Sequence, residues 1–203
     1  DCSYAAMSLS YPGLGCPGFV IDNPWSAAFI SWVMQRAGVP GFHDSPSHFD
    51  YVRAAHKDAA SPYLFVAPTS SQVQAGDMLC FVRSKALFGY DGLAKRIDAG
   101  DNGLPMHCDI IVAIDAGKVY AIGGNVQQAV TLRILPIDSQ NRLSGLLMRS
   151  ADDSPCAPDN EASCNFNRQD WAVLLRLKSQ DELARIGPVL PPSFQNNPPV
   201  PET

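Results

Sequence analysis

Three polar residues have types and positions suited to nucleophilic catalysis. Ser26 lies in the first turn of a predicted helix, where unpaired backbone N–H groups and the helix dipole favour negative charge. His107 opens the apolar run HCDIIVAI, and Asn125 follows the next such run, within the segment AIGGNV. A hydroxyl nucleophile, a histidine base and an amide that orients the ring are the parts of an acyl-transfer site. Each residue alone has a structural alternative: a serine bonded to helix backbone, a core histidine and a turn asparagine.

The helix carrying Ser26 is predicted over residues 24–37, in PWSAAFISWVMQRA. Asn23 is placed to cap it and Gly38 to end it. Ile30 shares a helical face with Ser26, so Ser26 is expected at the top of the stripe that packs on a sheet. A second helix is predicted to start at Ser45-Pro46 and to run through SHFDYVRAAHK.

From residue 76 onward the apolar pattern becomes that of short strands. These runs are GDMLCFV, HCDIIVAI, KVYAIGG, AVTLRIL and WAVLLRL. Asp115-Ala116-Gly117 predicts a tight turn between the second and third runs. Because no helix is apparent between the runs, we expect a mainly antiparallel sheet behind N-terminal helices, which is an α+β fold.

Strand alternation places His107 and Asp109 on one face, and Cys108 on the other. The hairpin also brings the segment 123–126 beside His107, so either Asn125 or Asp109 is expected to orient the imidazole ring. Cys108 points away and is a poor candidate for the nucleophile of this site.

His48 and Arg83 are supporting candidates near the same cleft. His48 lies near the start of the second helix, and Arg83 could bind a substrate carboxylate. The alternative for both is a structural or solvent-facing role.

The motifs in this order resemble a known group of cell-wall enzymes. PWSAAFISWVMQRAGV is similar to the WCAxFVSWxxxxAG helix of the CHAP group, the cysteine- and histidine-dependent amidohydrolases and peptidases that cut peptidoglycan. GDMLCF, HCDIIV and AIGGNV resemble the strands and the GN-containing segment of that group. More closely, PWSAAFISWVM, SHFDYV, GDMLC, HCDIIV and GGNV resemble domain of unknown function 2272, a bacterial family. This resemblance covers roughly residues 23–135.

The resemblance implies a papain-like fold of the CHAP or NlpC type. It assigns the nucleophile to Ser26, the base to His107 and the orienting role to Asn125. Here a serine stands where the cell-wall enzymes have cysteine. A histidine can hold a thiol as thiolate, whereas a serine hydroxyl must lose its proton during attack.

Composition excludes several other classes. The formal net charge of −5 and the scattered Lys and Arg residues do not suit nucleic acid. No apolar run approaches the ~20 residues of a membrane span. No cysteine pair has the CxxC spacing of a zinc site, so we expect neither metal nor cofactor.

Six cysteines are many for a cytosolic chain of 203 residues. Two pairs bracket short segments, and a third pair falls on strands predicted to be neighbours, as a disulfide or as buried thiols. These pairs are Cys2 with Cys16, Cys156 with Cys164, and Cys80 with Cys108. We therefore expect a periplasmic or secreted protein whose signal peptide has been removed, and the resemblance implies that it is bacterial.

The domain is predicted over residues 23–187. An irregular arm precedes it at 1–22, and a Pro-rich tail follows at 188–203. Long loops are expected at 84–106, as a lid or substrate-binding loop, and at 138–168.

Three functions remain open at this point. The first is hydrolysis of amide bonds in peptidoglycan peptides. The second is an inactive hydrolase-fold module that binds cell-wall peptide or a protein partner. The third is a secreted antibacterial effector or an envelope structural protein.

Overall fold

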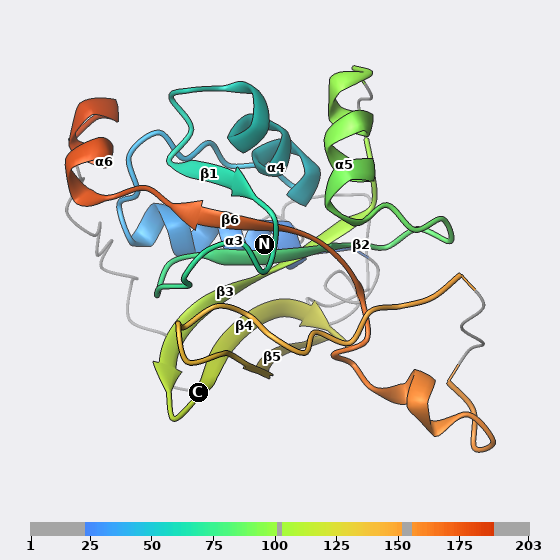
Figure 1. Cartoon of the computed structure of the whole chain (residues 1–203). Coiled ribbons are helices and arrows are strands. Elements are labelled where there is room, and N and C mark those ends of the chain that lie inside the picture. Colours follow the sequence, from blue (N-terminus) through green and yellow to red (C-terminus); the bar gives the residue numbers. More distant parts are fainter. Residues whose placement is uncertain (1–22, 101–102, 152–155, 189–203) are drawn as a thin grey trace, which may run out of the picture.

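A six-stranded antiparallel sheet organises the chain, with helices packed against it (Figure 1). The computed structural model describes residues 23–100, 103–151 and 156–188. The strands are β1 (Tyr63–Val66), β2 (Met78–Val82), β3 (Met106–Asp115), β4 (Lys118–Val126), β5 (Ala129–Pro136) and β6 (Asp170–Leu177), in the order β1-β6-β2-β3-β4-β5. The helices are α3 (Ser26–Arg36), α4 (His48–Lys57), α5 (Gly89–Asp98) and α6 (Gln180–Ile186), with a short 3-10 helix η1 (Glu161–Cys164). The α+β class and the antiparallel sheet predicted from the sequence are confirmed.

Helix α3 begins two residues later than its sequence pattern indicated. Its N-cap residue is Trp25, not Asn23, and Ser26 is its first helical residue. Gly38 follows the helix with a φ of +65°, a conformation that glycine adopts without strain. The face of α3 that carries Ser26, Ala27 and Ile30 is buried against the rest of the domain.

The β3–β4 hairpin has the predicted turn. Ala116 and Gly117 have φ values of +47° and +75°, and the strand pairing ends at Asp115 opposite Lys118. Two consecutive positive φ angles are typical of the type I′ turn, whose twist matches that of the strands.

Helix α5 was missed from the sequence. Residues 84–106 were predicted as a long loop, yet the structure has Gly89–Asp98 as a helix between β2 and β3. The sequence gives no clear helix signal here, because the segment contains Gly89 and Gly92 and glycine disfavours helix. Two tertiary contacts stabilise the helix instead. Leu93 and Ile97 are buried against the core. At the start of α5, the carboxylate of Asp170 on β6 accepts hydrogen bonds from the N–H groups of residues 88 and 89, at 2.8 and 3.0 Å.

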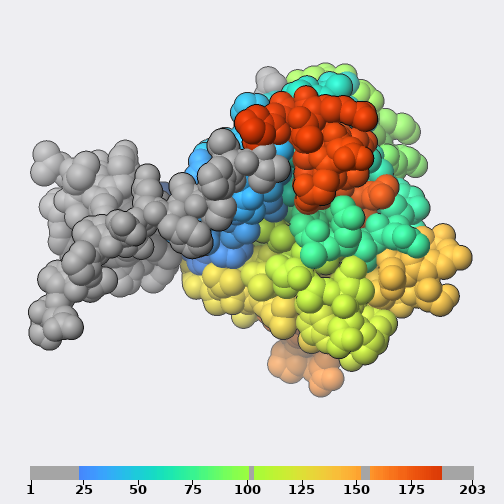
Figure 2. All heavy atoms as spheres, turned by 90° about the vertical axis from the view of Figure 1, so that its left-hand side faces the viewer, coloured from blue at the N-terminus to red at the C-terminus, as the bar shows by residue number. Residues whose placement is uncertain are grey.

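Two apolar clusters fill the two faces of the sheet. The first joins the helices to the sheet, through residues such as Ile30, Phe49 and Leu93. The second contains Phe81 and Trp171, and is closed by the segment that follows β5. From the side, α6 (red) and the β3–β4 hairpin (yellow-green) form opposite ends of one face, with α3 (blue) beside them (Figure 2). In the described ranges, no helix is both long and apolar enough to cross a bilayer.

Asp77, which follows Gly76 just before β2, links two strands through hydrogen bonds to backbone N–H groups. The buried carboxylate of Asp77 accepts the backbone N–H groups of Gln74 and Leu177 at 2.9 and 2.8 Å. It thereby ties the start of β2 to the end of β6. Burial raises the pKa of Asp77 to about 6, although these hydrogen bonds act in the opposite direction.

Two of the three proposed cysteine pairs form disulfides. Cys80 and Cys108 face each other across β2 and β3, and Cys156 joins Cys164 beside η1. Cys2 and Cys16 lie outside the described residues. The two disulfides are compatible with an oxidising compartment such as the periplasm or the cell exterior.

We predict that the Cys80–Cys108 disulfide contributes more stability than the Cys156–Cys164 disulfide. The first closes a loop of 28 residues and the second a loop of 8. Chain entropy gives roughly 3–4 kcal/mol for the first and about 2.5 kcal/mol for the second. Urea unfolding of the double variants Cys80→Ala/Cys108→Ala and Cys156→Ala/Cys164→Ala measures both. A larger loss in the second double variant would contradict the prediction.

Candidate functional site

The Ser26 hydroxyl lies at the first turn of α3 and is hydrogen-bonded to a histidine. Its Oγ is 2.6 Å from Nε2 of His48, at the start of α4. Nδ1 of the same ring is hydrogen-bonded to the hydroxyl of Tyr51, one turn further along α4. All three side chains are buried. The structure thus contains a serine–histidine pair, and its histidine is His48.

The tautomer of His48 decides whether its ring can act as a base for Ser26. If Nδ1 carries the ring proton and donates it to Tyr51, Nε2 is free to accept the Ser26 proton. In the other tautomer Nε2 donates to Ser26, and the ring is no base for it. Burial raises the pKa of Tyr51 well above its usual value, so the phenol stays neutral in either case.

His48 is held in its neutral form. Burial is the main cause, and His107 and Arg83 nearby add to it, so its pKa falls to about 2. The carboxylate of Asp109 acts in the opposite direction, but is the smallest of these effects.

His107 lies next to His48 and belongs to a second network. The centroids of the two rings are 5.1 Å apart. Nε2 of His107 lies 3.0 Å from Oδ1 of Asp109, and Nη2 of Arg83 lies 3.2 Å from Nδ1. An arginine only donates, so Nδ1 is the acceptor and Nε2 carries the proton given to Asp109. Asp109 is therefore the residue that orients the ring.

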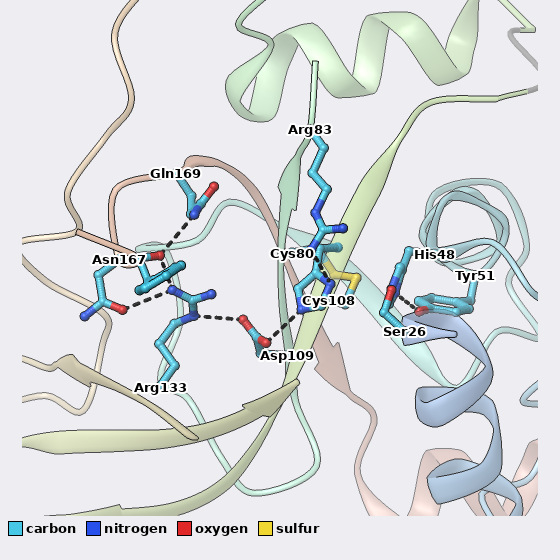
Figure 3. Close-up of polar contacts among 12 residues, drawn as sticks. Ser26, His48, Tyr51, Cys80, Arg83, Cys108, Asp109, Arg133, Asn167 and Gln169 are labelled. Carbon is cyan, nitrogen blue, oxygen red and sulfur yellow. Dashed lines mark hydrogen bonds and ion pairs between the residues drawn. A yellow bond between two sulfur atoms is a disulfide. The ribbon is translucent and has the colours of Figure 1, made fainter. Parts of the chain in front are cut away.

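Asp109 is paired on its other oxygen as well. Its Oδ2 accepts from Nε of Arg133 at 2.9 Å, and Arg133 also donates to the carbonyl of Phe166 and to Asn167 (Figure 3). Burial acts to raise the pKa of Asp109, but hydrogen bonds and charge from His107 and Arg133 outweigh it and lower that pKa. Arg133 was not identified from the sequence, because it lies within the apolar run AVTLRIL.

Among the hydrogen bonds of the described residues, none joins Asn125 to His107, so the orienting role predicted for Asn125 is taken by Asp109. The segment 123–126 does lie beside His107, as the hairpin predicted, but its point of approach is Gly123. A Cβ on Gly123 would lie 2.8 Å from Nε2 of His107 and 1.9 Å from Oδ1 of Asp109. Asn125 has a φ of +57° where the β4–β5 register shifts, so its backbone departs from the regular strand there.

The sequence-based candidates thus fall into two groups. Ser26 is hydrogen-bonded to His48, while His107, Asp109 and Arg83 form the neighbouring network. Their side chains come from α3, α4, β3 and the end of β2, and meet at one end of the sheet. Arg83 is exposed, whereas His48 is buried. In the described part of the chain, no group of three His, Cys, Asp or Glu residues could hold a metal ion.

We predict that Gly123→Ala disrupts the His107–Asp109 pair. The added methyl group would overlap the Asp109 carboxylate, so the variant should lose about 2–4 kcal/mol of unfolding free energy. Gly103→Ala is the control, since its Cβ would meet no atom within 4 Å. Thermal and urea unfolding compare the two variants, and equal stabilities would show that the close approach at Gly123 is absent.

We also predict that His48 makes the protein less stable as the pH falls. In the unfolded chain this histidine takes up a proton near pH 6.5, but in the folded protein it stays neutral down to about pH 2. Its contribution to the unfolding free energy is thus complete above pH 6.5. It should fall by about 1.4 kcal/mol per pH unit below that value.

Urea unfolding of the wild type and of His48→Gln between pH 7 and pH 4 tests this. The variant should be less stable at pH 7 but show a shallower loss on acidification. His43→Gln, at an exposed position, should keep the wild-type slope. Parallel curves for the wild type and His48→Gln would contradict a neutral, buried His48.

Comparison with known proteins gives one match. No curated protein and no solved structure is significantly similar to the chain. A family model described as "uncharacterized protein conserved in bacteria", domain of unknown function 2272, matches residues 5–177. This range extends beyond the residues 23–135 that carry the sequence motifs. The chain therefore belongs to the bacterial family of domain of unknown function 2272.

Proposed function

We propose that this protein hydrolyses amide bonds in cell-wall peptides, with Ser26 as nucleophile. The observation that carries the proposal is the 2.6 Å hydrogen bond between Ser26 and His48 at the first turn of α3. The substrate class comes from the resemblance of the motifs to the CHAP group. A nucleophile at the first turn of a helix supports the resemblance to papain-like enzymes, but the histidine bonded to Ser26 lies on α4, whereas the papain-like order would use His107 on β3. The disulfides support a periplasmic or secreted location.

The first step forms a bond between Ser26 Oγ and the carbonyl carbon of the substrate, as the hydroxyl proton passes to Nε2 of His48. The N–H groups at the start of α3 have no partner within the helix and are available to the oxyanion. The C–N bond then breaks, and the imidazolium returns its proton to the leaving amine. Water then attacks the acyl carbon as it gives a proton to the same ring, the C–Oγ bond breaks, and the imidazolium returns the proton to Ser26 Oγ, so that the acyl group leaves as a carboxylic acid.

His107 is the alternative base. Asp109 beside its Nε2 would stabilise a positive charge on the ring, whereas His48 has only the Tyr51 phenol in that position. Arg83 occupies Nδ1 of His107, however, and Ser26 is hydrogen-bonded to His48. We therefore assign the proton transfer to His48.

A second candidate is a binding module without catalysis. It is favoured by the burial of Ser26, which is 7% exposed, and by the low pKa of His48, since a base works best when its pKa is near the working pH. Binding of muropeptides without product would support this candidate. Labelling of Ser26 by a serine-directed phosphonate would argue against it.

We predict that Ser26→Ala lowers turnover of muropeptides by at least about 10³-fold, with the fold retained. Products are followed by chromatography and mass spectrometry of digested peptidoglycan. Ser31→Ala is the matched control: Ser31 is equally buried on the same helix, but is hydrogen-bonded to the backbone of Ser45. Undiminished turnover in Ser26→Ala would exclude Ser26 as the nucleophile.

The base is identified by comparing His48→Gln with His107→Gln in the same assay. Loss in His48→Gln comparable to that in Ser26→Ala supports the assignment. A clearly larger loss in His107→Gln would move the role of base to His107.

A further inference from the structure

A pocket lined by arginines lies next to the His107–Asp109 network. It has a volume of about 380 Å³, which suits a small ligand. Its polar lining is cationic or neutral: three arginines and two glutamines, with no acidic residue. The lining residues are Phe81, Val82, Arg83, Val126, Gln127, Arg133, Arg149, Phe166 and Gln169.

Among the residues that the structure describes, only one of the three guanidinium groups has a carboxylate partner. Arg133 is paired with Asp109. Arg83 donates to the neutral Nδ1 of His107, and Arg149 donates to the carbonyl oxygen of Ser84. The described residues thus leave two positive charges uncompensated in one pocket. Such charges are stabilised when an anion binds.

Arg149 has unused hydrogen-bonding capacity. Its Nε is buried and, within the described ranges, has no hydrogen-bond partner. Buried donors without a partner are uncommon, and a ligand oxygen would satisfy this one. Arg83 is exposed and uses one nitrogen for His107, so its remaining N–H groups are open to a ligand.

The other residues that line the pocket indicate the chemistry of the rest of the ligand. Phe81, Val82, Val126 and Phe166 give an apolar lining suited to small alkyl groups, and the glutamine amides can bind peptide groups. Planar guanidinium groups bind carboxylates through paired hydrogen bonds. We propose that this pocket binds the carboxylate of a peptide with small apolar side chains, through Arg83 and Arg149.

The proposal rests on the geometry of the pocket and requires no turnover at Ser26. Calorimetric titration of the full chain with N-acetyl-alanyl-alanine tests it, with the C-terminal amide of the same peptide and inorganic phosphate as the other arms. The free acid should bind at least tenfold more tightly than the amide. Equal binding of acid and amide, no detectable binding of the acid, or tighter binding of phosphate would each overturn the proposal.

Variants locate the binding. Arg149→Gln and Arg83→Gln should each weaken binding of the acid at least tenfold, and Arg149→Lys, which keeps the charge but not the planar group, should weaken it less. Arg176→Gln is the matched control, since it removes an exposed positive charge on β6 outside the pocket. Circular dichroism verifies the fold of each variant. Affinity for the acid that is unchanged in both Arg149→Gln and Arg83→Gln would overturn the proposal.

Discussion

The buried carboxylate of Asp109 is paired on both sides and constrains the structure around it. It is 1% exposed and lies between His107 and Arg133, which are themselves buried. An ionised carboxylate in a protein interior is costly unless it is paired and hydrogen-bonded, and removal of one partner typically costs about 3–5 kcal/mol. Strands β3 and β5 are therefore held in one relative position by this interaction.

The same interaction determines how the sheet is built around it. The regular pairing of β3 with β4 extends only as far as Ile110 opposite Ile122, and the Asp109 carboxylate lies against the backbone of Gly123. Any side chain at that position would occupy the space of the carboxylate. Next to it, a Cβ on Gly124 would lie 2.6 Å from the ring of Phe29. The two glycines thus let β4 approach β3 on one side and α3 on the other.

Sequence reasoning succeeded where local pattern determines structure. Alternation along one strand placed His107 beside Asp109, and the hairpin turn brought residues 123–126 to them. It also identified Cys80 and Cys108 as neighbours. The Ser26–His48 contact was not predictable in this way, because it depends on how α3 and α4 pack against each other.

Other features could not be predicted because they depend on contacts between residues far apart in the sequence. Arg133 was not singled out from the sequence, since its partner Asp109 lies two strands away in the sheet. Helix α5 has glycines at two of its first four positions, and depends on contacts with β6 that no local pattern records. The short strand β1 pairs with Leu174–Leu177, more than a hundred residues later in the chain. Such long-range contacts override local propensity.

The charge of Arg83 bears on both proposals. His48 must accept a proton for Ser26 to attack, but burial, with smaller contributions from His107 and Arg83, keeps its pKa low. Part of this effect comes from Arg83, whose charge has no carboxylate partner among the described residues. A peptide carboxylate bound to Arg83 would offset that charge and remove one of the smaller causes of the low pKa of His48, while burial, the largest cause, would remain. The two proposals therefore stand on separate observations, which are the hydrogen bond between Ser26 and His48 and the lining of the arginine pocket.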